Sequence, residues 1–473
     1  MTQTISAGLA DLRSGMDGPV IVPGDEDFDD RRRVWNAEID RRPSVIARCT
    51  SAADVVAAIA LARQYGLEIS VRGGAHNSAG TAICDDGMMI DLSLMNSVTI
   101  DPEARTALVG GGALLADLDA AAQQHGLAVP AGLISHTGVG GLTLGGGMGW
   151  LTRKFGLSID NLLSAEVVTA DGRVLRASQI ENPDLFWAIR GGGGNFGVVT
   201  QFEFRLHELD PTVQLAMFFW GIDQGPQVLR LAGELAADLP PELNIVIAAL
   251  NAPPEPFVPE QHQGAPGYAI LLTGFGAQQQ HASLAARIRA ELPPLFDLEI
   301  PIPYVQLQQL LDRASDWGFH GYEKGAYVEE LSDGVIRAVT ERLPRKSSPM
   351  SMVLFYRLDG AYSRADDDST AFSGGRSPRF AAFIVAVAPD ADMLAVERSW
   401  VLDTWEALRP YSIGGGDGYV NGTADYGQDR VRASYGPAKY ERLARIKAAY
   451  DPANAFHLNA NIEPARAAVP RQA

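Results

Sequence analysis

Up to residue 206, the chain alternates amphipathic stretches with short apolar runs, a pattern that predicts mixed helices and strands. Apolar residues recur at helical spacing from 52 to 65, behind Ser51 as an N-cap and before Gly66. A second helix is expected at 114–125, behind a glycine triplet. Strands are expected at 68–72, 88–92, 97–100, 107–109 and 198–206.

A hairpin is predicted around Asp171-Gly172, because this turn dipeptide separates two apolar runs at 165–169 and 173–176. Pro183-Asp184 then begins a short helix that we expect to end at residue 188. Helices and strands in this order indicate an α+β layer.

The pattern changes after Leu209-Asp210-Pro211, where amphipathic helices and longer strands follow one another. An antiparallel sheet backed by helices is expected here. Strands are predicted at 213–221, 244–250, 268–275, 350–355 and 379–388, and helices at 228–238, 281–292, 392–408 and 437–450. The ends, residues 1–30 and 464–473, lack clear periodicity, so order is least expected there.

Length and charge narrow the class of protein. A chain of 473 residues exceeds what one core normally supports, so two domains are expected. A formal net charge of −18 argues against binding to nucleic acid and to anionic membranes. Cys49 and Cys84 are too few for a disulfide framework and lack metal-ligand spacing, and Asp366-Asp367-Asp368 is interpreted as a solvated loop. We therefore expect no metal site.

Membrane insertion and export are not expected. The longest uncharged run, residues 120–152, contains nine glycines and a proline, which suit a buried loop better than a membrane helix. The N-terminus lacks a basic start followed by an apolar run. A cytoplasmic location is the default expectation.

Arg72-Gly73-Gly74-Ala75-His76-Asn77 places a histidine behind a glycine pair at the end of a predicted strand. Glycines let the backbone approach a flat ligand, so this imidazole is a candidate ligand contact. The alternative is a half-buried histidine with one hydrogen bond.

Thr137 to Trp150 carries seven glycines in fourteen residues. Such a stretch exposes unhindered N–H donors that suit a pyrophosphate, unless it forms only tight turns. The spacing matches neither a P-loop nor the dinucleotide fingerprint of a Rossmann fold. A nucleotide bound here would therefore use another scheme.

Four motifs in order resemble the berberine bridge enzyme-like flavoprotein oxidases of the vanillyl-alcohol oxidase superfamily. They are residues 72–77, 137–149, 190–197, and a C-terminal set formed by Tyr419-Val420-Asn421, 450–454 and 459–461. The resemblance is clear over 43–206 and 411–464. It implies a two-domain α+β fold with an FAD-binding domain at 1–206, a substrate domain at 207–417, and a segment at 418–473 that returns to the FAD domain.

The resemblance also implies roles for individual residues. His76 is similar to the histidine bonded covalently to the flavin 8α-methyl group, and a neutral imidazole is a competent nucleophile for that electrophilic carbon. Arg72, Gly73, Gly74, Ala75 and Asn77 resemble the loop that wraps the cofactor. The remaining implied FAD contacts are Thr137, Gly138, Gly140, Gly141, Gly145 and Gly146 at the pyrophosphate, Gly197 and Val199 at the adenine end, and Asn459 and Asn461 near the flavin.

One position departs from many relatives. Where they carry a second flavin-linked cysteine, this chain has Ile134, whose alkyl side chain cannot form a thioether. The chain thus resembles the singly linked bacterial branch. His136 differs from doubly linked members as well, and it either faces the active site or supports it from behind.

Tyr419 is the candidate catalytic base, since hydride transfer to flavin N5 requires removal of a proton from the substrate heteroatom. The alternative is a tyrosine that anchors the two domains. An aromatic wall from Trp317, Tyr322, Tyr327, Tyr356 and Phe383 is possible, although most aromatics at strand spacing form core.

The expected function is an FAD-linked oxidase that takes a hydride from a C–OH or C–N centre and passes electrons to O2, giving H2O2. The substrate is a small molecule: a sugar, a secondary-metabolite alcohol or an amine. Two alternatives remain open. One is a dehydrogenase or oxidative cyclase of a biosynthetic pathway with poor oxygen reactivity, and the other is a flavin-binding protein without turnover.

Overall fold

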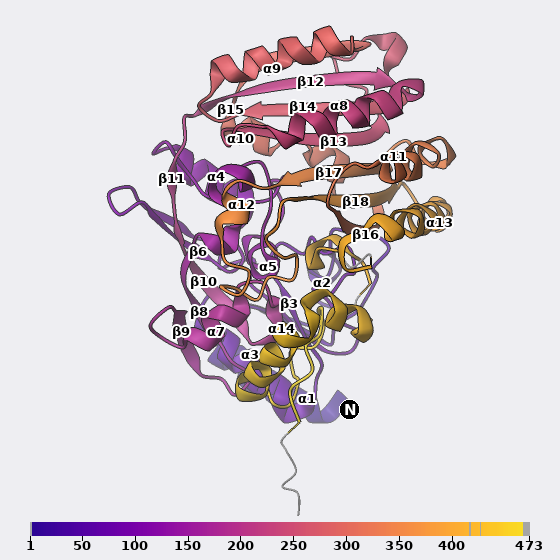
Figure 1. Ribbon diagram of the computed structural model, residues 1–473. Coiled ribbons are helices and arrows are strands. Elements are labelled where there is room, and N and C mark those ends of the chain that lie inside the picture. Colours follow the sequence, from indigo (N-terminus) through magenta and orange to yellow (C-terminus); the bar gives the residue numbers. More distant parts are fainter. Residues whose placement is uncertain (1, 416–417, 426, 467–473) are drawn as a thin grey trace, which may run out of the picture.

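The computed structural model describes residues 2–415, 418–425 and 427–466. The first part of the chain, up to residue 206, forms a four-stranded and a five-stranded sheet and is coloured from indigo to magenta in Figure 1. The smaller sheet has the order β1-β2-β4-β3, and β4 runs parallel to both β2 and β3. Helix α3 (Ala52–Tyr65) connects β2 to β3 and packs on this sheet. The strands are β1 (Val20–Ile21), β2 (Val45–Arg48), β3 (Ile69–Arg72) and β4 (Met88–Asp91).

The larger sheet of this part is antiparallel and has the order β5-β6-β10-β8-β9. Its strands are β5 (Val98–Asp101), β6 (Thr106–Gly110), β8 (Leu162–Val168), β9 (Val174–Ser178) and β10 (Val198–Arg205). Helices α4 (Leu115–Gln123) and α7 (Pro183–Ile189) pack against it through apolar side chains of one core. A short pair, β7 (Leu127–Ala128) with β11 (His207–Glu208), lies beside it.

The middle part forms a seven-stranded antiparallel sheet of order β15-β12-β14-β13-β17-β18-β16, which extends from the top of Figure 1 to its middle. The strands are β12 (Thr212–Gly221), β13 (Leu243–Asn251), β14 (Pro266–Gly274), β15 (Phe296–Pro303), β16 (His320–Val328), β17 (Met352–Leu358) and β18 (Arg379–Ala388). The helices that share its core are α8 (Gly225–Ala237), α9 (Gln278–Glu291), α11 (Asp333–Thr340) and α13 (Ala391–Leu408).

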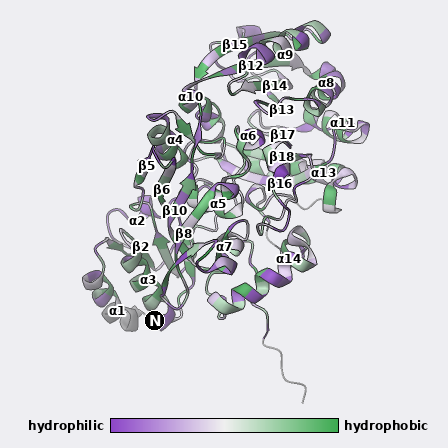
Figure 2. Ribbon diagram, turned by 60° about the vertical axis from the view of Figure 1, so that its left-hand side comes forward, coloured by the Kyte–Doolittle hydropathy of each residue, from purple (hydrophilic) through white to green (hydrophobic). Residues whose placement is uncertain are grey.

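The two faces of this sheet have different partners, because successive side chains of a strand point to opposite sides. On β13, Ile245 and Ile247 belong to the core shared with the helices. Val246 and Ala248 belong to a second core with Trp150 of the first part. One face is thus covered by helices, and the other faces the first part of the chain. Hydrophobic residues accordingly follow the strands, whereas the late helix α14 (Gln428–Tyr450) carries many hydrophilic residues (Figure 2).

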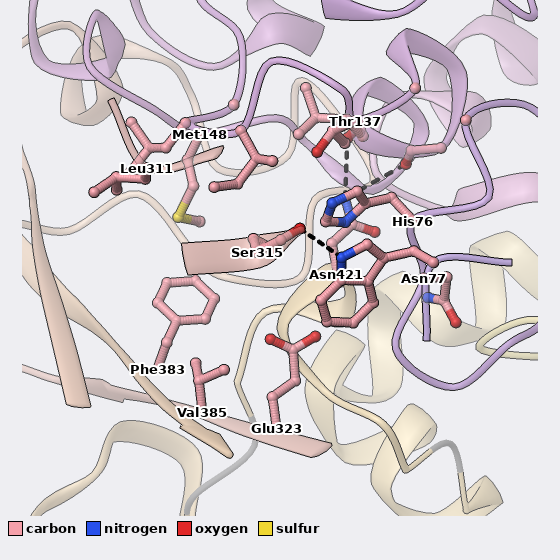
Figure 3. Close-up of a pocket in the computed structure, with 18 of the residues that line it drawn as sticks. His76, Asn77, Thr137, Met148, Leu311, Ser315, Glu323, Phe383, Val385 and Asn421 are labelled. Atoms are coloured by element: carbon pink, nitrogen blue, oxygen red, sulfur yellow. Dashed lines mark hydrogen bonds between the residues drawn. The ribbon is translucent and has the colours of Figure 1, made fainter. Parts of the chain in front are cut away.

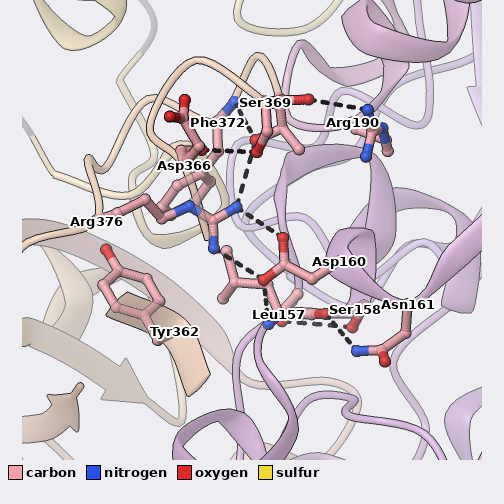
Figure 4. Close-up of polar contacts among 12 residues, drawn as sticks. Leu157, Ser158, Asp160, Asn161, Arg190, Tyr362, Asp366, Ser369, Phe372 and Arg376 are labelled. Carbon is pink, nitrogen blue, oxygen red and sulfur yellow. Dashed lines mark hydrogen bonds and ion pairs between the residues drawn. The ribbon is translucent and has the colours of Figure 1, made fainter. Parts of the chain in front are cut away.

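A buried ion pair joins the middle part to the first part. Arg376 donates to both carboxylate oxygens of Asp160, at 2.8 and 2.7 Å, and its guanidinium lies over the ring of Phe372 (Figure 4). Asp160 also accepts the backbone N–H of Leu157. This bidentate geometry fixes the loop after β17 against the residues that follow the glycine-rich segment.

The chain returns to its first part through α14 and the tail behind it. Gly436, at φ 71°, and Pro437 interrupt the helix. Near its end, the fully buried Lys447 donates to the carboxylate of Asp451 at 2.6 Å, to the carbonyl of Asn195 at 2.6 Å and to the carbonyl of Phe456 at 3.0 Å. The side chain of Asn195 contacts the tail as well, at Ala460 and Ile462. These contacts hold the tail against the glycine-rich residues 191–197.

Most elements expected from the sequence are confirmed. Helix α3 has the predicted ends with Ser51 as its N-cap, the β8–β9 hairpin forms, and β18 spans the predicted residues.

Asp366, Asp367 and Asp368 lie in an exposed turn, and the described residues contain no cluster suited to a metal ion. No helix among them is long and apolar enough to span a membrane. Both cysteines are buried, unpaired thiols.

Several expectations differ from the structure. Residues 2–15 form helix α1 (Thr2–Gly15), although their pattern predicts no element. Strands β15 and β16 are absent from the prediction, since prolines interrupt one and charges the other. Residue 417, the expected end of the substrate domain, lies outside the described residues, as do residues 467–473 of the tail.

The glycine-rich run was expected to be a loop and instead contains helix α5 (Val139–Gly145). Neighbouring backbone stabilises its start, because Val139 donates to the carbonyl of Ala113. A Cβ on Gly140 would lie 2.9 Å from the carbonyl oxygen of Gly111, and one on Gly145 would lie 2.2 Å from the side chain of Asn421. These glycines are therefore needed for close packing of a helix.

Replacing Lys447 by methionine is expected to lower the free energy of unfolding by about 3–5 kcal/mol, because Asp451 is left buried without its cation. Urea denaturation measures the change. Arg287→Gln, which breaks the exposed pair with Glu291, is the control and should cost less than about 0.5 kcal/mol. Equal effects of the two substitutions would contradict a special role for the buried ammonium.

Candidate active site

A cavity of about 1070 Å³ lies between the first part of the chain and the second face of the seven-stranded sheet. The loop after β3, the glycine-rich segment and the C-terminal tail line one side. Strands β12 to β18 contribute residues to the other side, among them Glu323, Phe383 and Val385 (Figure 3). The apolar lining from the middle part includes Met217, Val246, Leu250, Leu271, Leu298, Ile302, Leu354, Tyr356, Phe383 and Val385.

His76 lines this cavity just beyond the end of β3. The ring of Trp35 stacks on its imidazole with centroids 4.8 Å apart, and the ring of His136 lies 4.9 Å away on a tilted plane. Burial, followed by the nearby His136, lowers the pKa of His76 to about 3. The imidazole is therefore neutral at physiological pH, with a lone pair available as a nucleophile.

Two glycine segments meet at the cavity with almost no space between them. A Cβ on Gly74 would lie 2.3 Å from the backbone nitrogen of Gly138, so both positions exclude side chains. Helix α5 begins directly after Gly138, and the first N–H groups of a helix have no acceptor within it. Gly140 and Gly141 line the cavity, and the Cβ direction of Gly141 is open. Backbone donors in a space without side chains suit a pyrophosphate. We call Gly138, Gly140 and Gly141 the glycine cradle.

A second part of the lining comes from residues 191–197 and the tail. Gly193, Gly194 and Asn459 line the cavity together. Among the described residues, the buried Oδ1 atom of Asn459 has no hydrogen-bond partner, a state that is costly unless a ligand supplies a donor. Together with the cradle and the neutral imidazole, this orphaned acceptor fits an extended nucleotide cofactor such as FAD.

The residues predicted from the sequence divide into two sets. Gly73, Gly74, Ala75, His76, Asn77, Thr137, Gly138, Gly140, Gly141, Gly197, Val199, Tyr419 and Asn459 line the cavity. Arg72, His136, Gly145, Gly146 and Asn461 do not. Arg72 donates to the carbonyl of Arg31 and lies 3.9 Å from Asp91, so it supports the loop from outside. Gly146 packs under Phe372 and Tyr419.

Tyr419 reaches the cavity from the C-terminal segment, and its side chain is buried. Its phenolic oxygen accepts hydrogen bonds from the backbone N–H of Gly147 at 2.8 Å and from the amide of Asn421 at 2.9 Å. Donors on this oxygen stabilise negative charge there. The same bonds also tie the segment to the glycine-rich run, so the geometry supports both interpretations of this tyrosine.

Glu323 on β16 is a functional candidate that sequence reasoning missed. It lines the cavity and accepts a hydrogen bond from the hydroxyl of Ser78. Burial raises its pKa to about 7, which the hydrogen bond from Ser78 partly opposes. Figure 3 shows its carboxyl group among the residues that face the same space as His76. The sequence feature that points to Glu323 is its pairing with the adjacent charge of Lys324 inside a strand that otherwise contains mostly uncharged residues.

The predicted aromatic wall is formed by two of its five candidates. Tyr356 and Phe383 line the cavity and meet edge to face, with centroids 5.3 Å apart. Tyr322 and Tyr327 are buried in core, and Trp317 is partly exposed away from the cavity lining.

Comparison with known proteins agrees with this geometry. Residues 43–178 match the family model described as FAD binding domain, and residues 418–463 match the model described as Berberine and berberine like. The (R)-6-hydroxynicotine oxidase of Paenarthrobacter nicotinovorans is 34% identical, with 94% of this chain and 97% of that protein covered. An FAD-linked oxidoreductase of Dictyostelium discoideum is 31% identical, with 95% of each covered.

Two solved structures share the fold of this chain over nearly its whole length. 6-Hydroxy-D-nicotine oxidase from Arthrobacter nicotinovorans matches with a TM-score of 0.84 and 30% identity, covering 95% of this chain and 98% of that one. A variant of a berberine bridge enzyme-like protein of Physcomitrella patens matches with a TM-score of 0.85 and 25% identity, covering 97% of this chain and 99% of that one.

The raised pKa of Glu323 predicts a pH-dependent cost to folding. An unfolded glutamate ionises near its model value of 4.5, whereas the folded one ionises at about 7, so Glu323 opposes folding increasingly as pH rises through this window. Glu323→Gln should therefore gain stability over the parent, by up to about 3 kcal/mol above pH 8 and by little at pH 4. Urea unfolding across pH tests this, with the exposed Glu260→Gln as control. A pH-independent difference would contradict it.

Proposed function

Because this chain belongs to the berberine bridge enzyme-like FAD-linked oxidoreductases, we propose that it is an oxidase that removes a hydride from a C–OH or C–N centre of a small organic molecule and reduces O2 to H2O2. The observation that carries the proposal is one cavity containing both a neutral His76 next to a glycine cradle and a carboxyl group with a pKa of about 7. A cofactor site and an acid–base group thus face one another.

FAD, when bound, supplies the two-electron acceptor. The backbone of Gly138, Gly140 and Gly141 offers donors to its pyrophosphate, and the side-chain carbonyl oxygen of Asn459 offers an acceptor to a donor group of the cofactor. The apolar lining of the middle part keeps water from the reacting centre.

We place the proton acceptor at Glu323. A carboxyl group with a pKa of about 7 is partly ionised at neutral pH, and it is suited to accept the proton that a hydroxyl or ammonium group loses as hydride leaves the adjacent carbon. Ser78 fixes its orientation through the hydrogen bond to Oε1. Tyr419 is the second candidate, because two donors stabilise charge on its oxygen.

The cavity walls favour a substrate with apolar rings. Aliphatic and aromatic side chains of the seven-stranded sheet face the space, and Glu323 is labelled among them in Figure 3. The other charged side chains of the lining, Glu255 and Arg313, form an ion pair with each other. An alicyclic or aromatic amine, or a hydroxylated ring compound, buries mainly apolar surface against these walls. A sugar fits them less well, because its hydroxyl groups require many polar partners. The name of the 34% identical relative, a 6-hydroxynicotine oxidase, agrees with this class.

We further propose that His76 holds FAD through a single covalent bond. The neutral, buried imidazole is suited to attack at the 8α-methyl carbon. Ile134 lines the cavity, and neither Cys49 nor Cys84 is among the lining residues. The sequence resemblance aligns Ile134 with the cysteine of doubly linked relatives.

The covalent bond predicts that flavin stays with the polypeptide after acid precipitation. Peptide mapping should find flavin on one peptide that contains His76, and His76→Ala should bind a flavin that acid releases. His281→Ala, at a buried histidine outside the cavity lining, is the control. Release of all flavin from the parent protein, or flavin on a cysteine peptide, would overturn this assignment.

Anaerobic flavin reduction by a panel of cyclic amines, ring alcohols and sugars tests the function and its base. With the best substrate, Glu323→Gln should reduce its flavin about 10²- to 10⁴-fold more slowly than the parent, because the proton acceptor is lost. Tyr419→Phe, which keeps the ring and its packing, should slow reduction by less than about tenfold.

Several outcomes would contradict these assignments. The reverse order of the two variants makes Tyr419 the base. Slow reoxidation by O2 supports a dehydrogenase or cyclase, and absence of flavin bleaching by the whole panel supports a flavin-binding protein without turnover.

A further inference from the structure

The imidazole of His76 lies between two other rings, and only one of these faces the cavity. Trp35 stacks on it with planes 18° apart and lines the cavity. His136 lies against it with planes 40° apart and is not among the lining residues. The ring of His136 therefore lies next to His76 and outside the cavity lining.

His136 has an unusual polar state. Among the described residues, neither of its ring nitrogens, Nδ1 and Nε2, has a hydrogen-bond partner, and both atoms are buried. The Nε2 atom of His76 is in the same state. A buried nitrogen without a partner typically costs about 1–3 kcal/mol, so such a pair calls for an explanation beyond packing. His136 therefore has an imidazole lone pair without a hydrogen-bond partner next to the ring of His76.

The position of His136 is fixed from the other part of the chain. Its neighbour Ser135 donates its backbone N–H and its hydroxyl group to the carboxylate of Asp312, at 2.8 and 2.6 Å. Asp312 begins the short helix η5 (Asp312–Ser315). At the end of this helix, the carbonyl of Ser315 accepts the indole N–H of Trp35 at 2.6 Å. The same turn thus holds both rings that enclose His76.

We propose that His136 is a positioning and proton-accepting residue for attachment of the flavin to His76, and that Asp312 holds it in place through Ser135. The inference rests on the proposed covalent bond at His76. His136 takes the N–H proton of His76 while the other nitrogen of His76 forms a bond to the 8α-methyl carbon. One C–H bond of that methyl group breaks, its electron pair and proton pass to the flavin ring system, and the ring system is reduced by two electrons. O2 then reoxidises it and yields H2O2.

The test measures how fast flavin becomes covalent. Each protein, produced under riboflavin limitation, is incubated with FAD in air, and acid-stable flavin is measured over time. His136→Gly should bind FAD but attach it about 10²- to 10⁴-fold more slowly than the parent. Added imidazole should restore much of the rate, whereas pyrazole, which has a similar shape but is a far weaker base, should not. Asp312→Asn should also slow attachment, because the carboxylate that orients Ser135 is lost.

His207→Gln is the matched control, because this histidine also stacks on an aromatic ring, that of Phe155, but lies outside the cavity lining. It should attach flavin at the parent rate. Parent-rate attachment in His136→Gly overturns the proposal, and so does equal rescue by imidazole and pyrazole, which would show that only volume matters. Should His136→Gly fold poorly, His136→Gln gives the same readout with an amide that accepts no proton. Release of all flavin from the parent protein is a different outcome, which overturns the His76 bond itself.

Discussion

The site depends on one buried ammonium group. Lys447 is fully buried and contacts Asp451 directly after the end of α14, Asn195 of the glycine-rich residues 191–197, and Phe456 of the tail. A buried charge is tolerated only when it is paired and hydrogen-bonded, so these three contacts must persist together. They bring two segments more than 250 residues apart in sequence, as Asn195 and Lys447 are, into fixed positions at the cavity. The cofactor side of the site is thus assembled by a structural ion pair that does not itself line the cavity.

Local chemistry explains which elements the sequence predicted well. Helix α3 has a serine N-cap and a left-handed glycine at its end, and the β8–β9 hairpin has Asp-Gly at its turn, so both are encoded within a few residues. Helix α5 is different. Its glycines disfavour a helix, and it forms because Ala113, Gly111 and Asn421 approach it from distant segments. Tertiary packing determines that this segment is helical, so its local sequence pattern does not predict the helix.

The same distinction applies to the site. Motif spacing led to the loop around His76, to the glycine cradle and to Asn459, which line one cavity. The sequence pattern does not single out Glu323, because burial is what raises the pKa of its carboxyl group. Its hydrogen-bond donor Ser78 lies 245 residues away in the sequence, so no local pattern predicts this contact. The enclosure of His76 by Trp35 and His136 was hidden for the same reason. Motifs identify the residues that touch a cofactor, whereas the groups that tune them become evident only in three dimensions.

The alternation along β13 and β17 separates two tasks within each strand. Ile245, Ile247 and Phe355 hold the helices, while the residues between them, such as Val246 and Leu354, form the cavity wall. The wall residues are not part of the helix-bearing core on the opposite face. Evolution can therefore reshape the pocket for a new metabolite one side chain at a time, on a scaffold whose folding is secured by the opposite face of the same strands.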